Sequence, residues 1–78
     1  MREYLRICRN EHGLTQEMTA DKAGVSRAYY TRVEAGSRQK NMSLSMLEKL
    51  AKVFSVSVAE LIEAEQQYRA GVSEKEAG

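Results

Sequence analysis

The feature that most constrains the fold is a pair of short helices predicted within residues 15–36, with a tight turn between them. Thr15 and Ser26 each precede a stretch of helix-forming residues, and such side chains favour helix starts because their oxygen accepts an unpaired backbone N–H. Gly24 can adopt the positive φ that ends the first of these helices and lets the next one depart sharply. Gly36 ends the second helix in the same way. The stretch therefore predicts two helices held at a fixed angle.

Three further helices follow from capping signals and hydrophobic periodicity, so the predicted fold class is all-α, a compact domain of five helices. Gly13 ends the first helix, and Ser43 caps the fourth. The last helix begins with the capping box Ser57-Val-Ala-Glu60. The five predicted helices span residues 2–11, 16–22, 27–35, 44–54 and 58–68.

Apolar residues at helical spacing define the faces that we expect to be buried. In the first helix these are Tyr4, Leu5 and Cys8. In the fourth helix they are Leu44, Leu47, Leu50, Ala51 and Phe54. We expect residues 1–69 to form one domain, and the polar, glycine-flanked segment 70–78 to form a flexible C-terminal tail.

The composition limits the class of protein. No apolar run approaches the roughly 18 residues that a membrane span needs, and charged residues interrupt the first ten positions, which argues against a secretory signal. The single cysteine allows no internal disulfide and fits a reducing cytoplasm. We therefore expect a cytoplasmic protein without a membrane partner.

Charge is distributed unevenly along the chain, although the net charge is only +1. Residues 1–41 contain eight basic and five acidic residues, whereas residues 42–78 contain four basic and six acidic residues. The basic half includes the two-helix stretch, which favours an anionic partner at that part of the molecule.

The two-helix stretch has the form of a helix-turn-helix, whose second helix can lie in the major groove of DNA. Tyr30 and Val33 face inward on that helix, so its opposite side points to solvent. Arginine can bond guanine O6 and N7 bidentately, and a small alanine permits close approach. Outward arginines on a short helix more often belong to an ordinary solvent-exposed surface, but the caps and the glycine turn around these two favour contact with DNA bases. The predicted base-reading residues are Arg27, Ala28, Thr31 and Arg32.

Six short motifs are distributed over residues 5–61. They are Leu5-Arg-x-x-Arg9, Gly13-Leu-Thr-Gln-Glu17, Ala23-Gly-Val-Ser-Arg27, Tyr29-x-x-Arg-Val-Glu34-x-Gly36, Ser43-Leu44 and Val56-Ser-x-x-Glu-Leu61. In combination they resemble the Cro/C1-type helix-turn-helix family, also called the XRE family, of phage and bacterial repressors. The resemblance implies a compact, lambda-repressor-like helical domain that binds operator DNA, usually as a two-fold dimer.

The resemblance also implies roles for the matched positions. Arg9 and Glu34 match a structural pair that links the first helix to the end of the third, and we favour this role over DNA contact. Gln16 would contact a phosphate or an adjacent base. The outward residues Arg27, Ala28 and Arg32 match base-reading positions.

Contacts to phosphates are expected around the starts of the second and fourth helices. A helix N-terminus attracts anions because its first N–H groups are unpaired, and such contacts position a protein without reading sequence. Each candidate could instead be an ordinary surface residue, and Arg38 and Lys40 are favoured because they precede the start capped by Ser43. The expected positioning residues are Gln16, Tyr29, Arg38, Lys40, Asn41 and Ser43.

The chain departs from the family pattern in three places. Thr19 stands where a buried leucine is usual, and Tyr30 stands where isoleucine is common. We expect the two changes to compensate, with Tyr30 filling the space that Thr19 leaves. The connection between Gly36 and Leu44 is longer than the common family version and lacks its proline.

Other reactive residue types do not form a recognisable site. Cys8 occupies an apolar position and is expected to be a packed thiol, and His12 at a helix end suits the helix dipole. One histidine and one cysteine do not make a metal site, and no catalytic triad or phosphate-binding glycine loop is recognisable. We therefore expect no enzyme activity, no cofactor and no metal.

Two functional interpretations remain open. The first is a sequence-specific regulator of transcription that binds double-stranded DNA, a repressor that acts as a homodimer on an inverted repeat and associates with the nucleoid when bound. The second is a protein-interaction module on the same fold, such as an antitoxin. The short C-terminal segment leaves little room to wrap a protein partner, which favours the first interpretation. The expected dimer surface, whose residues could instead complete the core, comprises Phe54, Val58, Ile62 and Tyr68.

Overall fold

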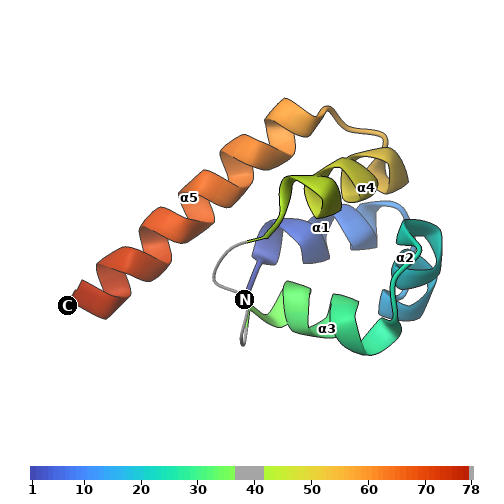
Figure 1. Cartoon of the computed structure of the whole chain (residues 1–78), viewed down its shortest axis with the longest axis horizontal. Helices are drawn as coiled ribbons and strands as arrows, with labels where there is room; N and C mark the ends of the chain where they lie inside the picture. The colour runs from blue at the N-terminus through green and yellow to red at the C-terminus, as the bar shows by residue number, and fades with distance from the viewer. Residues whose placement is uncertain (37–41, 78) are drawn as a thin grey trace.

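The computed structural model describes residues 1–36 and 42–77, the last six as backbone only, and shows five helices and no strand in those ranges (Figure 1). The predicted all-α class is confirmed. The helices are α1 (Glu3–Glu11), α2 (Gln16–Ala23), α3 (Arg27–Ala35), α4 (Leu44–Phe54) and α5 (Val58–Ala77). No helix in the described part of the chain is both long enough and apolar enough to cross a membrane.

The predicted helix starts are confirmed by side-chain caps. The hydroxyl oxygen of each predicted cap accepts a hydrogen bond of 3.1 Å from the backbone N–H three residues later. Each cap satisfies a donor that would otherwise lack a partner, which contributes roughly 1 kcal/mol to stability. The four caps are Thr15, Ser26, Ser43 and Ser57.

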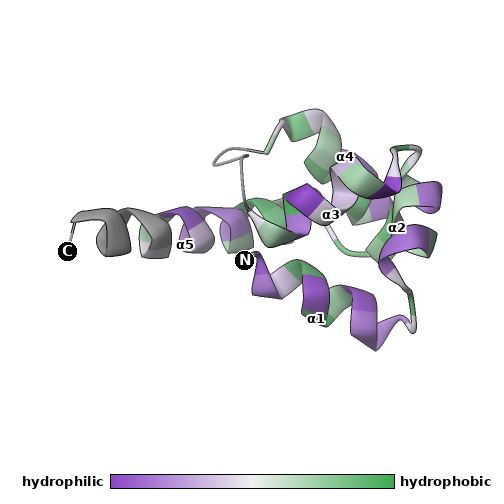
Figure 2. Cartoon of the chain, turned by 90° about the horizontal axis from the view of Figure 1, so that it is seen from below, coloured by the Kyte–Doolittle hydropathy of each residue, from purple (hydrophilic) through white to green (hydrophobic). Residues whose placement is uncertain are grey.

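The core lies where α1, α2, α3 and α4 meet, and α5 covers one side of it. Figure 2 shows apolar residues on the inner faces of these helices and polar residues on the outer faces. Burial of such residues is the main favourable contribution to folding. The most deeply buried apolar residues, all at most 1% exposed, are Leu5, Ala20, Tyr30, Val33, Leu50 and Phe54.

The predicted inward face of α4 is wrong at its first residue. Leu44 is 59% exposed, whereas Met46, which was not predicted, is 3% exposed. At 100° per residue Leu44 lies roughly 90° from the centre of the buried stripe, and it belongs to the first turn, where no preceding turn covers it. Met42, just before the cap, is also buried and fills the adjacent space.

The predicted end of the last helix is also wrong. Helix α5 continues to Ala77, well beyond the expected end near Tyr68, and its C-terminal part projects past the other helices (Figure 1). Gly71 is not among the glycines with positive φ, so it continues the helix instead of ending it. Glycine costs only about 1 kcal/mol relative to alanine inside a helix, and the glutamate and lysine residues that follow favour helix. The division between a domain of residues 1–69 and a flexible segment 70–78 stays a prediction.

Thr19 and Tyr30 are both fully buried, as the departures from the family pattern suggested. The Thr19 hydroxyl donates to the Thr15 carbonyl oxygen at 2.9 Å, so its burial leaves no polar group without a partner. The Tyr30 hydroxyl has no hydrogen-bond partner among the described residues. Whether Tyr30 fills the space beside Thr19 stays a prediction.

A buried ion pair that sequence reasoning missed joins the start of the chain to α5. Arg2 and Glu65 are 0% and 2% exposed, and their two hydrogen bonds measure 2.8 and 2.9 Å. Burial raises the pKa of Glu65, but the hydrogen bonds from Arg2 and Tyr4 and the positive charge of Arg2 together lower it by more. The pKa of Glu65 is therefore below its ordinary value. Breaking such a pair by removing one partner costs about 3–5 kcal/mol because the other charge stays buried.

Candidate nucleic-acid interface

The α2–turn–α3 unit presents one face of α3 to solvent. Gly24 ends α2 with φ +72°, a left-handed conformation that glycine adopts without strain, and Ser26 then starts α3. The opposite face of α3 is anchored in the core by Tyr30, Val33 and Glu34, all at most 1% exposed. The outward direction of the remaining residues is therefore fixed by the packing of the inward ones.

The four predicted base-reading residues lie together on this outward face. They line a single open hollow on the protein surface. Three of them are exposed, and Thr31 is half-buried. We call this set the α3 ridge, and it consists of Arg27, Ala28, Thr31 and Arg32.

The arginines of the α3 ridge differ from the other described arginines in their ion pairing. Arg2, Arg6, Arg9 and Arg69 each form an ion pair with a glutamate. Within the described residues, no ion pair involves Arg27 or Arg32. Their guanidinium groups are thus exposed cations with donors available to an external acceptor.

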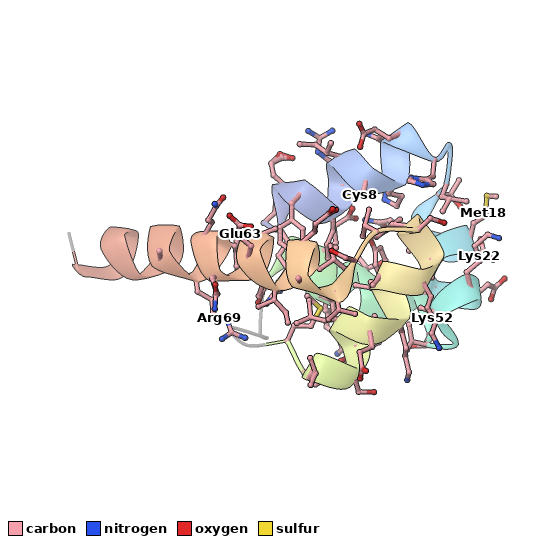
Figure 3. The ribbon with its side chains drawn as sticks, turned by 90° about the horizontal axis from the view of Figure 1, so that it is seen from above. Cys8, Met18, Lys22, Lys52, Glu63 and Arg69 are labelled. Carbon is pink, nitrogen blue, oxygen red and sulfur yellow. The ribbon has the colours of Figure 1, made fainter. Side chains whose placement is uncertain are left out.

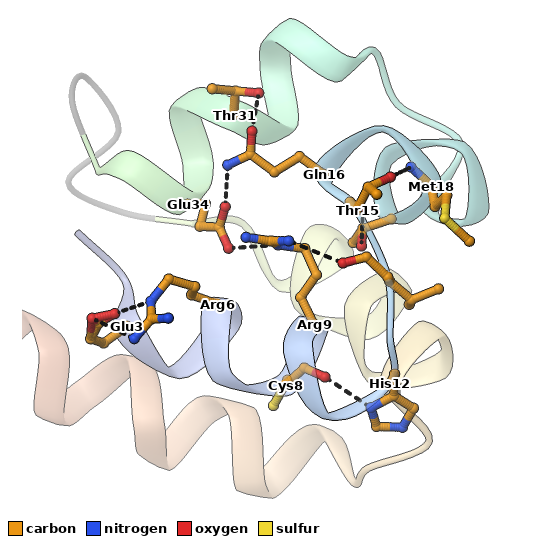
Figure 4. A network of polar contacts seen from close by, with 12 residues as sticks. Glu3, Arg6, Cys8, Arg9, His12, Thr15, Gln16, Met18, Thr31 and Glu34 are labelled. Carbon is orange, nitrogen blue, oxygen red and sulfur yellow. Dashed lines mark hydrogen bonds and ion pairs between the residues drawn. The ribbon is translucent and has the colours of Figure 1, made fainter.

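A chain of polar contacts supports the ridge from behind (Figure 4). The Thr31 hydroxyl donates to Gln16 Oε1 at 3.3 Å, and Gln16 Nε2 donates to Glu34 Oε2. Arg9 Nε donates to Glu34 Oε1 at 3.0 Å, and Arg9 Nη1 donates to the Leu14 carbonyl at 3.0 Å. The Arg9–Glu34 contact is the one that the family resemblance implies, and it ties α1 to the end of α3.

Gln16 has a structural role in this network. Both ends of its amide are engaged inside the protein, so the side chain is held in one orientation next to Thr31. Sequence reasoning treated Gln16 as a DNA contact and missed its bond to the buried Glu34. One signal for this bond was available in the sequence: an acidic residue on the inward face of α3 needs a polar partner, and the start of α2 offers one. A contact between Gln16 and DNA stays a prediction.

The structure describes only some of the other predicted positioning residues. Tyr29 is half-buried and packs against the core, and the Ser43 hydroxyl is used as the cap of α4. Arg38, Lys40 and Asn41 lie outside the described residues. A second open hollow lies beside the ridge, and its lining includes Arg27 together with the first residues of α2. That hollow contains the α2 N-terminus, where unpaired N–H groups favour an anion.

The predicted dimer surface is wrong at Phe54. This ring is 1% exposed and lies 5.8 Å from the His12 ring, centroid to centroid, so it packs inside the chain and offers no area to a second copy. Val58, Ile62 and Tyr68 are half-buried, and the first two pack partly on the core. Their role between subunits stays a prediction.

Cys8, Lys22 and Lys52 lie outside the α3 ridge. Burial raises the pKa of the Cys8 thiol, which favours the protonated form over the reactive thiolate. Lys22 and Lys52 point outward from the body (Figure 3). Within the described ranges, no three histidine, cysteine or acidic side chains are grouped so that they could hold a metal ion.

The family model described as helix-turn-helix matches residues 5–61, which run from α1 into α5 and include the whole α2–turn–α3 unit. The chain belongs to this family. It is a Cro/C1-type helix-turn-helix protein, as the sequence motifs indicated, and the members of this family are DNA-binding regulators of transcription.

Two relatives and one solved structure illustrate the match. YqaE, an uncharacterised HTH-type transcriptional regulator of Bacillus subtilis, is 36% identical over 63 residues, which are 81% of this chain and 53% of YqaE. The chain thus spans about half the length of that relative. Control protein C.SmaI of Serratia marcescens is 38% identical over 60 residues, which are 77% of this chain and 69% of the relative. The crystal structure of the clp gene regulator ClgR from Corynebacterium glutamicum aligns with a TM-score of 0.70 and 25% identity, covering 94% of this chain and 76% of that one.

Proposed function

We propose that this helix-turn-helix protein is a sequence-specific transcriptional regulator, a repressor that binds an inverted-repeat operator as a homodimer. Each subunit inserts α3 into the major groove of double-stranded DNA, and the α3 ridge reads base edges. Arg27 and Arg32 bond guanine O6 and N7, and Ala28 contacts a neighbouring base. Each good arginine–guanine pair contributes about 1–3 kcal/mol of discrimination against other bases.

The observation that carries this proposal is that the two arginines on the ridge are exposed and form no ion pair with any described residue. Every other described arginine forms an ion pair with a glutamate, so these two are set apart by position and by electrostatics. Buried anchors fix the helix that carries them, which keeps the backbone positions of the two arginines at a constant separation. Two bidentate donors carried by one anchored helix suit the regular spacing of base edges in a groove.

The homodimer is supported by α5, whose C-terminal part projects beyond the body (Figure 1). Half-buried apolar side chains, Val58 and Ile62, lie on this helix. Two copies related by a two-fold axis would place their α3 helices one helical turn apart, roughly 34–36 Å. A protein that occupies an operator in this way represses by excluding other proteins from the DNA. We place it in the cytoplasm, on the nucleoid.

The test is a comparison of three alanine variants on a selected duplex and on random duplexes. Arg32→Ala should weaken binding to the selected duplex by roughly 10–100-fold and leave binding to random duplexes little changed. Arg38→Ala should weaken binding to both kinds of duplex alike, and should reduce the dependence of log K on log salt by about one unit.

Lys52→Ala is the matched control, because it removes one exposed positive charge from α4 and leaves α3 intact. It should change neither discrimination nor, beyond a small factor, affinity. If Arg32→Ala and Lys52→Ala behave alike on both kinds of duplex, the reading role of the α3 ridge is wrong.

A further inference from the structure

A buried polar cluster connects the end of α3 to α5, and we call it the α5 joint. It consists of Arg2, Tyr4, Glu65 and Tyr68. The charged members Arg2 and Glu65 are almost completely excluded from solvent. A buried charge is costly unless it is paired and hydrogen-bonded, so the arrangement of this cluster is closely specified.

On one side, Arg2 holds the C-terminal end of α3. Its backbone N–H donates to the Glu34 carbonyl at 2.7 Å, and its Nη1 donates to the Val33 carbonyl at 2.7 Å. Carbonyl groups in the last turn of a helix have no partner within the helix, and a positive charge there is favourable. Arg2 therefore caps the helix that carries the α3 ridge.

On the other side, the same guanidinium group holds α5. Its Nε and Nη2 donate to the two carboxylate oxygens of Glu65 at 2.8 and 2.9 Å, and the Tyr4 hydroxyl donates to Glu65 Oε1 at 2.6 Å. One turn along α5, the Tyr68 ring stacks with the guanidinium carbon 4.7 Å from the ring centroid. A bidentate pair fixes direction as well as distance, so α5 cannot rotate freely relative to α3.

From these contacts we infer that Arg2 and Glu65 are positioning residues for operator recognition, which set the half-site spacing that the dimer accepts. The inference rests on the proposed homodimer through α5. The reading surface lies on α3 and the subunit contact on α5, and the α5 joint fixes the angle between the two. One base pair more between half-sites moves the second site by about 3.4 Å and rotates it by about 34°, so a rigid joint favours a single spacing.

The test uses the double variant Arg2→Met/Glu65→Leu. Replacing a buried ion pair by apolar residues of similar volume is often neutral for stability, so this variant is expected to fold while losing the directed bonds. The matched control is Glu3→Leu/Arg6→Met, which makes the same replacements in an ion pair within α1 whose side chains are 51% and 42% exposed. Binding is measured by fluorescence anisotropy on selected inverted repeats whose spacing is changed one base pair at a time, and on a single half-site.

The wild type and the control should prefer one spacing over its neighbours by at least about tenfold, whereas the double variant should show a preference below about threefold. Affinity for the single half-site should stay within about twofold in all three proteins, because the ridge itself is unchanged. A purely structural role of the joint would lower both kinds of binding together and leave the preferred spacing intact.

Two failures are distinguishable. If the wild type forms no dimer or prefers no spacing, the proposed homodimer fails, and the inference fails with it. If the wild type prefers one spacing and the double variant keeps that preference, the inference alone is overturned. Should the double variant not fold at the assay temperature, Glu65→Gln, which keeps the shape but weakens the bidentate pair, is judged by the same spacing profile.

Discussion

Gly36→Ala should destabilise the protein more than Gly24→Ala, although both glycines end a helix with nearly the same positive φ, +68° and +72°. The difference lies in their surroundings. A Cβ atom at Gly24 would meet nothing within 4 Å. A Cβ atom at Gly36 would overlap with the hydroxyl oxygen of Tyr68 and lie 3.3 Å from its Cζ.

The expected magnitudes follow from two contributions. A residue with a side chain in the left-handed conformation costs roughly 1–2 kcal/mol, and this cost is common to both variants. At Gly36 the Tyr68 ring must also move away from the Arg2 guanidinium, and a cation–π contact of this kind contributes roughly 0.5–2 kcal/mol. We therefore expect Gly24→Ala to lose about 1–2 kcal/mol of unfolding free energy and Gly36→Ala to lose about 2–4 kcal/mol.

Urea denaturation, monitored by circular dichroism, measures both losses. The same glycine substitution is then made in the Tyr68→Phe protein, which lacks the hydroxyl group. Without the hydroxyl, the severe overlap is removed and only the 3.3 Å approach to the ring carbon remains, so Gly36→Ala in the Tyr68→Phe protein should cost only slightly more than Gly24→Ala in the wild type. Equal losses for the two glycine variants in the wild type, or no rescue by Tyr68→Phe, would refute the contact between the end of α3 and α5.

Three further predictions concern buried or half-buried side chains. Tyr30→Phe removes a buried hydroxyl that has no partner among the described residues, and should be neutral or raise the unfolding free energy by up to about 1–3 kcal/mol; a clear loss in urea denaturation would reveal a hidden partner. The folded-state pKa of Glu65 is lowered, so ionised Glu65 should stabilise the fold above pH 4.5, its ordinary pKa, and this stabilisation should be lost as the pH falls through the folded-state pKa. Thermal melts should show the loss of stability at low pH, and Glu65→Gln should show a smaller loss. Burial raises the pKa of Cys8, so its thiol should react with a disulfide reagent at pH 8 more slowly than a free cysteine peptide does, and an equal rate would contradict the packed position.

Helix starts and the outward face of α3 were predictable from sequence because they depend on local chemistry. A serine or threonine cap acts within one turn, and a left-handed glycine acts at one residue, so Thr15, Ser26 and Gly24 specify the α2–turn–α3 unit almost by themselves. The outward direction of Arg27 and Arg32 then follows from helical geometry.

The features that were missed depend on contacts between distant parts of the chain. Arg2 and Glu65 are 63 positions apart, and charged residues are usually exposed, so nothing local indicates that they pair with each other. One signal was present: Glu65 lies four residues after Leu61, in the same apolar stripe of α5, where an acidic residue needs a partner. Phe54 was misplaced because an apolar residue at a helix end suits either a core or an interface, and only the packing of the whole domain decides between them.

The most direct test of the account is methylation interference on a duplex selected from a random pool. Dimethyl sulfate methylates guanine N7 in the major groove, the atom that Arg27 and Arg32 are proposed to bond. Methylation should block binding of the wild type at guanines placed symmetrically in the two half-sites, and Arg32→Ala should abolish the interference at one guanine in each. Binding that tolerates methylation of every guanine N7, or an identical interference pattern with Arg32→Ala, would contradict recognition by the α3 ridge in the major groove.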